Sequence, residues 1–200
     1  MKKKITVSDK TDPIVRYTVI AETSEELFRM PGTGNGDKNL LARTKLDMTV
    51  HADSQKNVGT LTAYILQVPT MQVGSAERAD KQPLPAMQVA VDWLCNHASW
   101  RQMLNKSKES QDSPDLILPI TTALYVESMF VEPPHRLHGI GTAMLDYSVV
   151  LARPDAVCAF ISAQNSPELA VFLRRVGLVN RGTFTVNRPW ERKELYESDR

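Results

Sequence analysis

A glycine-containing turn at residues 136–141, Arg-Leu-His-Gly-Ile-Gly, constrains this chain more than any other feature. The apolar run over 123–131 that precedes it predicts a strand, and the run over 142–151 that follows predicts a helix. Backbone N–H groups at the start of a helix have no partners within the helix and lie at the positive end of its dipole. Gly139 and Gly141 allow a ligand close to the backbone, and Arg136 adds a cation. The turn therefore predicts a binding site for a phosphate group.

The composition is that of a globular protein with one domain. The chain has 200 residues, of which 42% are hydrophobic and 24% are charged, and its net charge is +1. This length suits a single α/β domain over residues 1–200, and the near-neutral charge argues against nucleic acid as a partner. The basic start, Lys2–Lys4, is not followed by a long apolar segment, so we expect no signal peptide, no membrane span and a cytoplasmic location.

Neither cysteines nor histidines form a pattern typical of a metal site. Cys95 and Cys158 both stand in apolar surroundings, which favours two buried thiols over a disulfide or a nucleophile. The histidines are scattered along the chain, at positions 51, 97, 135 and 138. We therefore predict no bound metal.

The first two thirds of the chain predict several strands and a long insertion. Strands are expected at 14–21, 45–51 and 57–67, the last two as an antiparallel pair, and a capping-box pattern at Thr23–Glu26 predicts a short helix that ends at Pro31. The glycine-rich stretch 31–39 is predicted to be a loop, because no strand feeds into it and no Gly-Lys-Ser/Thr follows. Residues 68–120 form an insertion with a helix over 86–104, and this helix carries Trp93 and Trp100 on one stripe.

The last third predicts alternating strands and helices. Strand 122–131 leads through the turn into helix 139–152, and a strand follows over 156–162. Ser166 and Pro167 begin a helix that ends at Val176, with Gly177 as its C-terminal cap. Two closing strands are expected at 178–186 and 194–196.

The order of these elements, together with Val131-Glu-Pro133, Arg136-x-x-Gly139-x-Gly141 and Leu145, resembles the acetyl-CoA-binding signature of the GNAT N-acetyltransferase superfamily. The resemblance covers residues 120–186 well and the first 67 residues only by element order. It implies a GNAT-like α/β (α+β) fold with a mixed, mostly antiparallel central sheet flanked by helices. It also implies a splayed pair of strands, an acetyl-CoA-binding core over 122–186, and the insertion before the strand that leads into the turn.

The resemblance also implies which residues would bind acetyl-CoA. The strand before the turn would bond the pantetheine arm as an added strand would, through Met129, Phe130 and Val131. Asn165 would lie near the thiol end, and the helix over 166–176, with Phe172, would pack beside the CoA. The diphosphate would be held by the turn, through Arg136, Leu137, His138, Gly139, Ile140, Gly141 and Thr142. A Rossmann dinucleotide site is the competing interpretation, but position 144 is Met instead of the third glycine and Asp155 precedes the next strand instead of ending it.

The expected activity is transfer of an acetyl group from acetyl-CoA to an amine by direct attack in a ternary complex. Glu127, the only acid within the 123–131 run, is the candidate base. The tyrosine that often protonates the departing thiolate in this family is absent, because the matching position is Leu173. Tyr196 and Tyr147 are the candidate substitutes, with Tyr196 preferred, and solvent is the other proton source.

Three matters stay open at the level of sequence. The chain could instead be a non-catalytic acyl-CoA-binding module, which the missing tyrosine favours, or it could be directed at a protein or RNA acceptor. The insertion is expected either to cover the acceptor site or to make a contact in a homodimer. The acceptor itself is not readable from the residues of 21–44 and 68–120.

Overall fold

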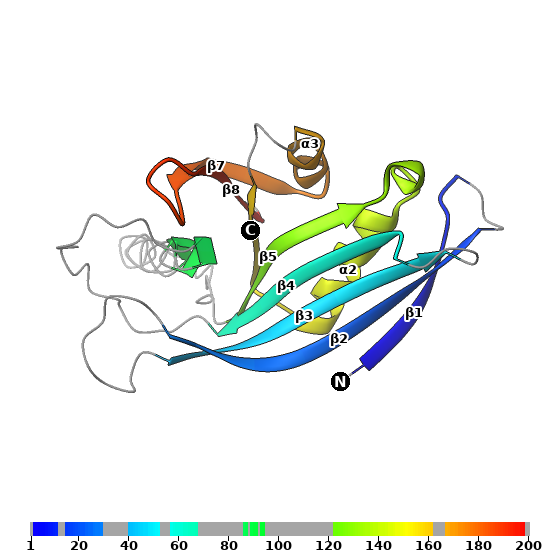
Figure 1. Ribbon diagram of the computed structural model, residues 1–200, viewed down its shortest axis with the longest axis horizontal. Coiled ribbons are helices and arrows are strands. Elements are labelled where there is room, and N and C mark those ends of the chain that lie inside the picture. Colours follow the sequence, from blue (N-terminus) through cyan, green and yellow to red (C-terminus); the bar gives the residue numbers. More distant parts are fainter. Residues whose placement is uncertain are drawn as a thin grey trace, which may run out of the picture.

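A computed structural model describes residues 2–11, 15–29, 40–52, 57–67, 86–87, 89–91, 93–94, 122–161 and 167–198. The described elements form one mixed sheet with helices on it (Figure 1). The strands are β1 (Lys2–Ser8), β2 (Arg16–Arg29), β3 (Leu40–Ala52), β4 (Gly59–Gln67), β5 (Thr122–Val131), β6 (Ala156–Ile161), β7 (Leu178–Thr185) and β8 (Arg192–Ser198). The helices are the short 3-10 helix η2 (Pro133–His135), α2 (Ile140–Ala152) and α3 (Pro167–Arg175).

The sheet has the order β1-β2-β3-β4-β5-β6-β8-β7, and its only parallel pair is β5 with β6 among the described strands. This pairing runs only from Ala123–Val126 against Ala156–Ala159, so the described parts of the two strands separate beyond Val126. The fold class predicted from the sequence is therefore confirmed: a mixed, mostly antiparallel sheet with a splayed strand pair.

Two features of the N-terminal part differ from the sequence prediction. The short helix expected from Thr23 is wrong, because residues 23–29 continue β2 and pair with β3 from Thr23–Leu46 to Arg29–Leu40. Long-range pairing over a whole strand outweighs a local capping pattern. The strand β1 was not predicted, since its charged residues Lys2–Lys4 hide the apolar alternation. Lysines are common on such edge strands because they discourage pairing with another chain.

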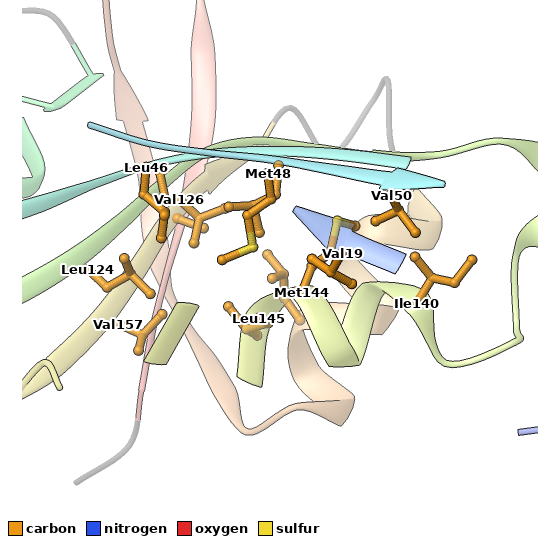
Figure 2. Close-up of a cluster of buried hydrophobic side chains, with 14 of the residues drawn as sticks. Val19, Leu46, Met48, Val50, Leu124, Val126, Ile140, Met144, Leu145 and Val157 are labelled. Atoms are coloured by element: carbon orange, nitrogen blue, oxygen red, sulfur yellow. The ribbon is translucent and has the colours of Figure 1, made fainter. Parts of the chain in front are cut away.

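The main core lies between the sheet and α2 (Figure 2). Met144 and Leu145 of α2 pack against residues of four strands, β2, β3, β5 and β6. These residues are Val19, Leu46, Met48, Val50, Leu124, Val126 and Val157. Ser148, also fully buried on α2, donates its hydroxyl to the carbonyl of Met144 at 2.7 Å, so this buried hydroxyl is satisfied within its own helix. This packing fixes where α2 begins, and so where the turn before it lies.

A second core covers the opposite face of the sheet. Its helical part comes from the insertion, where Ala90, Val91 and Leu94 are fully buried. They belong to one cluster with sheet residues Tyr64, Leu66, Ala123, Tyr125, Cys158, Phe160 and Leu195. The helix predicted over 86–104 is thus present at its described residues, between 86 and 94, and the rest of it, with Cys95 and Trp100, lies outside the described residues. The described residues of the insertion therefore form part of the second hydrophobic core.

Candidate functional site

The turn between β5 and α2 has the geometry of a backbone cradle. After η2, Leu137 adopts a left-handed backbone with φ of 68°, and Gly139, the N-cap of α2, has φ of 88°. Glycine reaches this region without the steric cost of a Cβ atom. The first bond of the helix runs from the N–H of Ala143 to the carbonyl of Gly139 at 3.0 Å. Within the described part of the chain, the amides from Leu137 to Thr142 donate no backbone hydrogen bond.

The residues of this turn, except His138, line a cavity of about 540 Å³ between the end of β5, the start of α2 and α3. Ten of the twelve cofactor-binding residues predicted from the sequence line it: Met129, Phe130, Val131, Arg136, Leu137, Gly139, Ile140, Gly141, Thr142 and Phe172. The structure therefore brings together residues that lie up to 43 positions apart. The lining is completed by Lys10, His135, Glu168, Leu169, Arg175 and Val176.

Gly141 allows α3 to approach the turn. A Cβ atom at this position would lie 3.4 Å from Cε2 of Phe172 and 3.9 Å from Sδ of Met129. The aromatic ring of α3 and the thioether of β5 thus meet over the first turn of α2. The cavity is thus lined by apolar side chains, such as Met129 and Phe172, as well as by cations, which suits a ligand that has both a charged and a long apolar part.

The described residues that line the cavity include the cations Arg136, Arg175 and Lys10. Arg136 donates its Nε–H to the carbonyl of Val131 at 3.0 Å, which fixes the guanidinium across the end of β5. Arg175 stands in the last turn of α3, and Lys10 follows β1. No sequence signal pointed to Lys10, because the polar stretch around it resembles any surface turn. Glu168, in the first turn of α3, is the carboxylate among the described lining residues.

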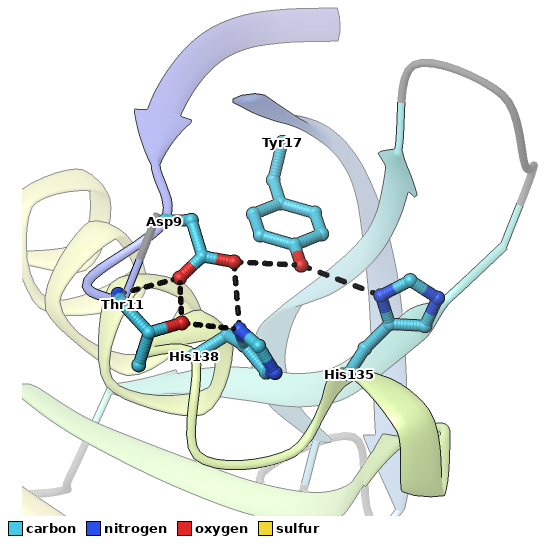
Figure 3. Close-up of polar contacts among 5 residues, drawn as sticks. All are labelled: Asp9, Thr11, Tyr17, His135 and His138. Atoms are coloured by element: carbon cyan, nitrogen blue, oxygen red, sulfur yellow. Dashed lines mark hydrogen bonds and ion pairs between the residues drawn. The ribbon is translucent and has the colours of Figure 1, made fainter. Parts of the chain in front are cut away.

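His138 differs from the other turn residues predicted to contact the cofactor, because its side chain does not line the cavity. Its Nδ1 atom lies 2.7 Å from Oδ2 of Asp9 and 2.9 Å from Oγ1 of Thr11 (Figure 3). His135 does line the cavity, and its Nδ1 lies 3.3 Å from the hydroxyl of Tyr17, which donates to Asp9. The imidazole of His138 thus joins the turn to the N-terminal segment. Asn165 lies outside the described residues.

Glu127 occupies a β-bulge. The pairing of β5 with β4 shifts by one residue between Ser128–Thr62 and Val126–Ala63, so Glu127 has no partner on β4. Regular alternation along the strand would place Glu127 on one face with Tyr125, Met129 and Val131. The bulge divides this set, and Glu127 stays beside Tyr64, which stacks on Tyr125. The extra residue reverses the alternation: Met129 and Val131 pack against the α2 core, whereas Tyr125 belongs to the second core. Bulges re-aim side chains near functional sites, and this one lies where β5 leaves β6.

The exposed carboxylate of Glu127 has one partner among the described residues: the hydroxyl of Tyr64 donates to its Oε2 at 3.4 Å. Burial raises the pKa of Tyr64 above its usual value, and the charge of Glu127 adds to this rise. The guanidinium of Arg43 lies 4.4 Å above the Tyr64 ring and is held by Glu26 at 2.6 Å. Tyr64 was not predicted, since only the fold brings β4 beside the bulge.

Glu127 is not among the described residues that line the cavity, and neither are the other candidates for proton transfer. Tyr196 is 2% exposed in the main core, and its hydroxyl donates to Glu194 at 2.9 Å. Burial raises its pKa, with a further contribution from that hydrogen bond. Leu173, at the position of the family tyrosine, is 1% exposed and faces the same core. Tyr147 is partly buried and also packs against it.

Cys158 is fully buried, and burial raises the pKa of its thiol. A thiol in this state is a poor nucleophile, as expected from its apolar surroundings. The described residues contain no group of three or more His, Cys, Asp or Glu side chains arranged to hold a metal ion. In the same part of the chain, no helix is both long enough and apolar enough to cross a membrane.

No protein-family model matches this sequence. No curated protein sequence matches it either. Several solved structures resemble its fold, and acetyltransferases are among them.

Nourseothricin acetyltransferase matches 98% of this chain and 97% of its own at 13% identity, with a TM-score of 0.43. NAA60 of Arabidopsis thaliana in complex with acetyl-CoA matches 88% and 97% at 11% identity, with a TM-score of 0.44. A structure from Corynebacterium glutamicum, described as histone acetyltransferase HPA2 and related acetyltransferase, matches 77% of this chain at 12% identity with a TM-score of 0.38.

The chain spans 64% of the length of the Corynebacterium structure, less than two thirds. The similarity to these acetyltransferases is one of overall fold at low identity. At these identities and TM-scores it carries no weight for the activity, which has to be argued from the residues of the site.

Proposed function

We propose that this protein binds acetyl-CoA in the cavity between β5, α2 and α3 and transfers the acetyl group to an amine. The observation that carries the proposal is the meeting, at one cavity, of turn amides and a strand edge that have no backbone partner among the described residues. The amides from Leu137 to Thr142 suit a diphosphate, because they are donors at the positive end of α2. The edge of β5 beyond Val126 has no described neighbour on its β6 side, so it can bond an extended arm.

The arm would run along β5 from Val131 towards Glu127. Four strand residues span about 13 Å at the usual rise of a strand, so a long flexible arm is needed to reach from the turn to the bulge. Pantetheine is such an arm, and its amide groups match the donors and acceptors of a strand edge. With the arm in this direction, the thioester would lie near the point where β5 and β6 separate, next to the bulge at Glu127.

Glu127 is proposed as the base. In the transfer, a bond forms between the amine nitrogen and the acetyl carbon, and the bond between that carbon and the CoA sulfur breaks. Glu127 accepts the proton that the amine loses, directly or through one water. The hydrogen bond from Tyr64 to Oε2 holds the carboxylate in one orientation and leaves its other oxygen for this proton. The departing thiolate takes its proton from solvent, because Leu173 and Tyr196 face the core.

A thiol-release assay tests the proposal. Purified protein is titrated with CoA by calorimetry, and free thiol is then followed with acetyl-CoA and a panel of primary amines. We expect binding and turnover with at least one amine. Glu127→Gln should lower kcat by roughly 100-fold or more, as loss of a general base does, with little change in CoA affinity. Asp146→Asn, an exposed acid on α2, is the matched control and should behave as the wild type.

The outcomes separate this proposal from a non-catalytic acyl-CoA-binding module. CoA binding without turnover for any amine would favour that module, which the burial of Leu173 at the tyrosine position also favours. Absence of CoA binding would contradict both functions. Turnover unaffected by Glu127→Gln would leave the transferase in place and remove Glu127 as its base.

A further inference from the structure

Among the described residues that line the cavity, Lys10 is the one from the first half of the chain. The other lining residues come from 129–142 and 168–176, the segments that the strand–turn–helix pattern predicts. Lys10 reaches the cavity because β1 ends at Ser8, and the chain then passes beside the turn before β2 begins at Arg16.

The stem of Lys10 lies directly on the turn. A Cβ atom added to Gly139 would lie 2.8 Å from Cδ, 2.9 Å from Cγ and 3.0 Å from Cε of Lys10. Contacts this short between carbon atoms leave no room for a Cβ atom at position 139 unless the lysine moves. The backbone N–H of Lys10 also donates to the carbonyl of His138 at 3.3 Å. The side chain of Lys10 therefore lies across the N-cap of α2. Its ammonium group is one bond beyond Cε, which is one of the atoms next to Gly139.

The residues on either side of Lys10 are anchored. Asp9, which is 5% exposed, contacts His138 and Tyr17 through Oδ2, while its Oδ1 accepts the backbone N–H and the hydroxyl of Thr11 at 2.7 Å each (Figure 3). Asp9, Thr11 and His138, which together form what we call the N-terminal clasp, hold the backbone of Lys10 at a fixed place over the turn. A lysine that is held before the ligand arrives loses less conformational entropy on binding.

The geometry points to Lys10 as a ligand of the acyl-CoA diphosphate, positioned over the turn amides by the N-terminal clasp. The inference rests on the proposed function and adds to it a cation that the glycine-rich motif does not contain. Arg136 and Arg175 also line the cavity, Arg136 with its Nε–H bonded to the carbonyl of Val131 and Arg175 in the last turn of α3. The amides of the turn are neutral donors, so a neighbouring positive charge strengthens their interaction with a diphosphate. Lys10 supplies such a charge at Gly139, the N-cap of α2.

Binding of CoA and of dephospho-CoA, which keeps the diphosphate but lacks the 3′-phosphate, tests this assignment. Lys10→Met keeps most of the stem and removes the charge. It should weaken binding of both compounds by roughly tenfold, the effect of losing one charged hydrogen bond, and the loss should shrink at high salt. Lys4→Met removes the same charge from the exposed edge of β1 and should bind like the wild type.

Each outcome of the binding experiment either supports or overturns the inference. Equal affinity of Lys10→Met and wild type for CoA would overturn the inference while leaving the proposed function intact. A loss seen with CoA but not with dephospho-CoA would also overturn it, because Lys10 would then contact the 3′-phosphate. If the wild type binds neither compound, the proposed function fails and the inference fails with it. Thermal unfolding of each variant, expected within a few degrees of the wild type, verifies that all of them fold.

Discussion

The Nδ1 atom of His138 lies 2.7 Å from Oδ2 of Asp9, and this contact joins two segments that are 129 positions apart in the sequence. The carboxylate is almost fully buried, with 2% of its side chain exposed, whereas the imidazole is 31% exposed. The pair therefore links the turn before α2 to the edge hairpin of the sheet. Tyr17 and Thr11 also contact the Asp9 carboxylate, so several side chains share this one buried acceptor.

Asp9→Ala should destabilise the fold. The substitution removes the shared acceptor of His138, Tyr17 and Thr11 and leaves their donors with fewer partners. We expect the free energy of unfolding to fall by about 2 kcal/mol, the cost of an unsatisfied buried polar group. Urea unfolding followed by circular dichroism measures it, with Asp146→Ala on the exposed face of α2 as the control. A loss no greater than that of the control would show that the N-terminal clasp contributes nothing to stability.

Alanine substitutions at Gly139 and Gly177 can be compared to separate the effect of backbone strain from the effect of the contact with Lys10. Both have φ of 88°, but a Cβ atom at Gly177 meets nothing within 4 Å, whereas at Gly139 it meets Lys10. Gly177→Ala should cost about 1 kcal/mol of stability through backbone strain alone and leave CoA affinity unchanged. Gly139→Ala should cost at least as much stability and also weaken CoA binding, because Lys10 and the turn must move apart.

Calorimetry with CoA and urea unfolding on both glycine variants provide the measurement. Equal CoA affinity of Gly139→Ala and Gly177→Ala would contradict the role given to the turn. If the combined variant Gly139→Ala with Lys10→Ala recovers stability lost by Gly139→Ala, the clash with the lysine stem is its cause.

The turn could be predicted from the sequence because strand, turn and helix are neighbours along the chain. Its left-handed glycine, its unpaired amides and the position of Phe172 all follow from local patterns and from a second strand–helix unit that packs next to the first. The contribution of Lys10 could not be predicted, because it depends on β1 lying at the edge of the sheet, next to a turn far along the chain. A strand whose first residues are lysines carries too little apolar alternation to be identified.

The environment of Glu127 was also beyond sequence reasoning. The residue was predicted to lie on the strand, which is correct, but its face depends on a bulge, and a bulge is a property of the register between two strands. The helix predicted from the capping-box pattern at Thr23–Glu26 was wrong for a related reason. The pattern is local in sequence, whereas the pairing of β2 with β3 that overrides it joins distant residues. The tyrosine that holds Glu127 comes from β4, so only the paired strands reveal it.

The stability of the fold should fall in alkaline solution. Burial raises the pKa of the Tyr125 phenol above its usual 10.0, with a smaller contribution from its charged neighbours. Above about pH 10 the unfolded chain releases this proton while the folded chain retains it, so the unfolded state binds fewer protons and the free energy of unfolding falls as pH rises. The stability linked to Tyr125 is thus fully present below about pH 10 and is lost above it.

Tyr125→Phe should make this loss shallower, by up to about 1.4 kcal/mol per pH unit, the value for one proton. Urea unfolding of wild type and variant at about pH 8 and about pH 11 checks the prediction through the difference in slope. Phenylalanine fills nearly the same volume, so the comparison is not confounded by a cavity. An identical decline in both proteins would mean that other buried groups, such as the Cys158 thiol, whose pKa is also raised by burial, account for the alkaline loss.

Leu94 tests the role of the insertion. It is fully buried in the second core, packed on the face of the sheet opposite α2, and it comes from the segment that the sequence assigned to the acceptor site or to a dimer contact. If the described helical part is core, Leu94→Ala should lower the free energy of unfolding by about 3 kcal/mol, since it leaves a cavity.

Val150→Ala, at a position 66% exposed on α2, is the control and should change stability by less than about 0.5 kcal/mol. The same urea titrations also give the m-value, which reports whether surface exposed on unfolding has changed. If Leu94→Ala alters acceptor KM or oligomeric state but leaves stability at the level of the control, the insertion serves the site or an interface instead. A loss of stability with unchanged KM would show that Leu94 stabilises the sheet. The two cores share the strands β4, β5 and β6, so packing on this face also supports the face that carries α2.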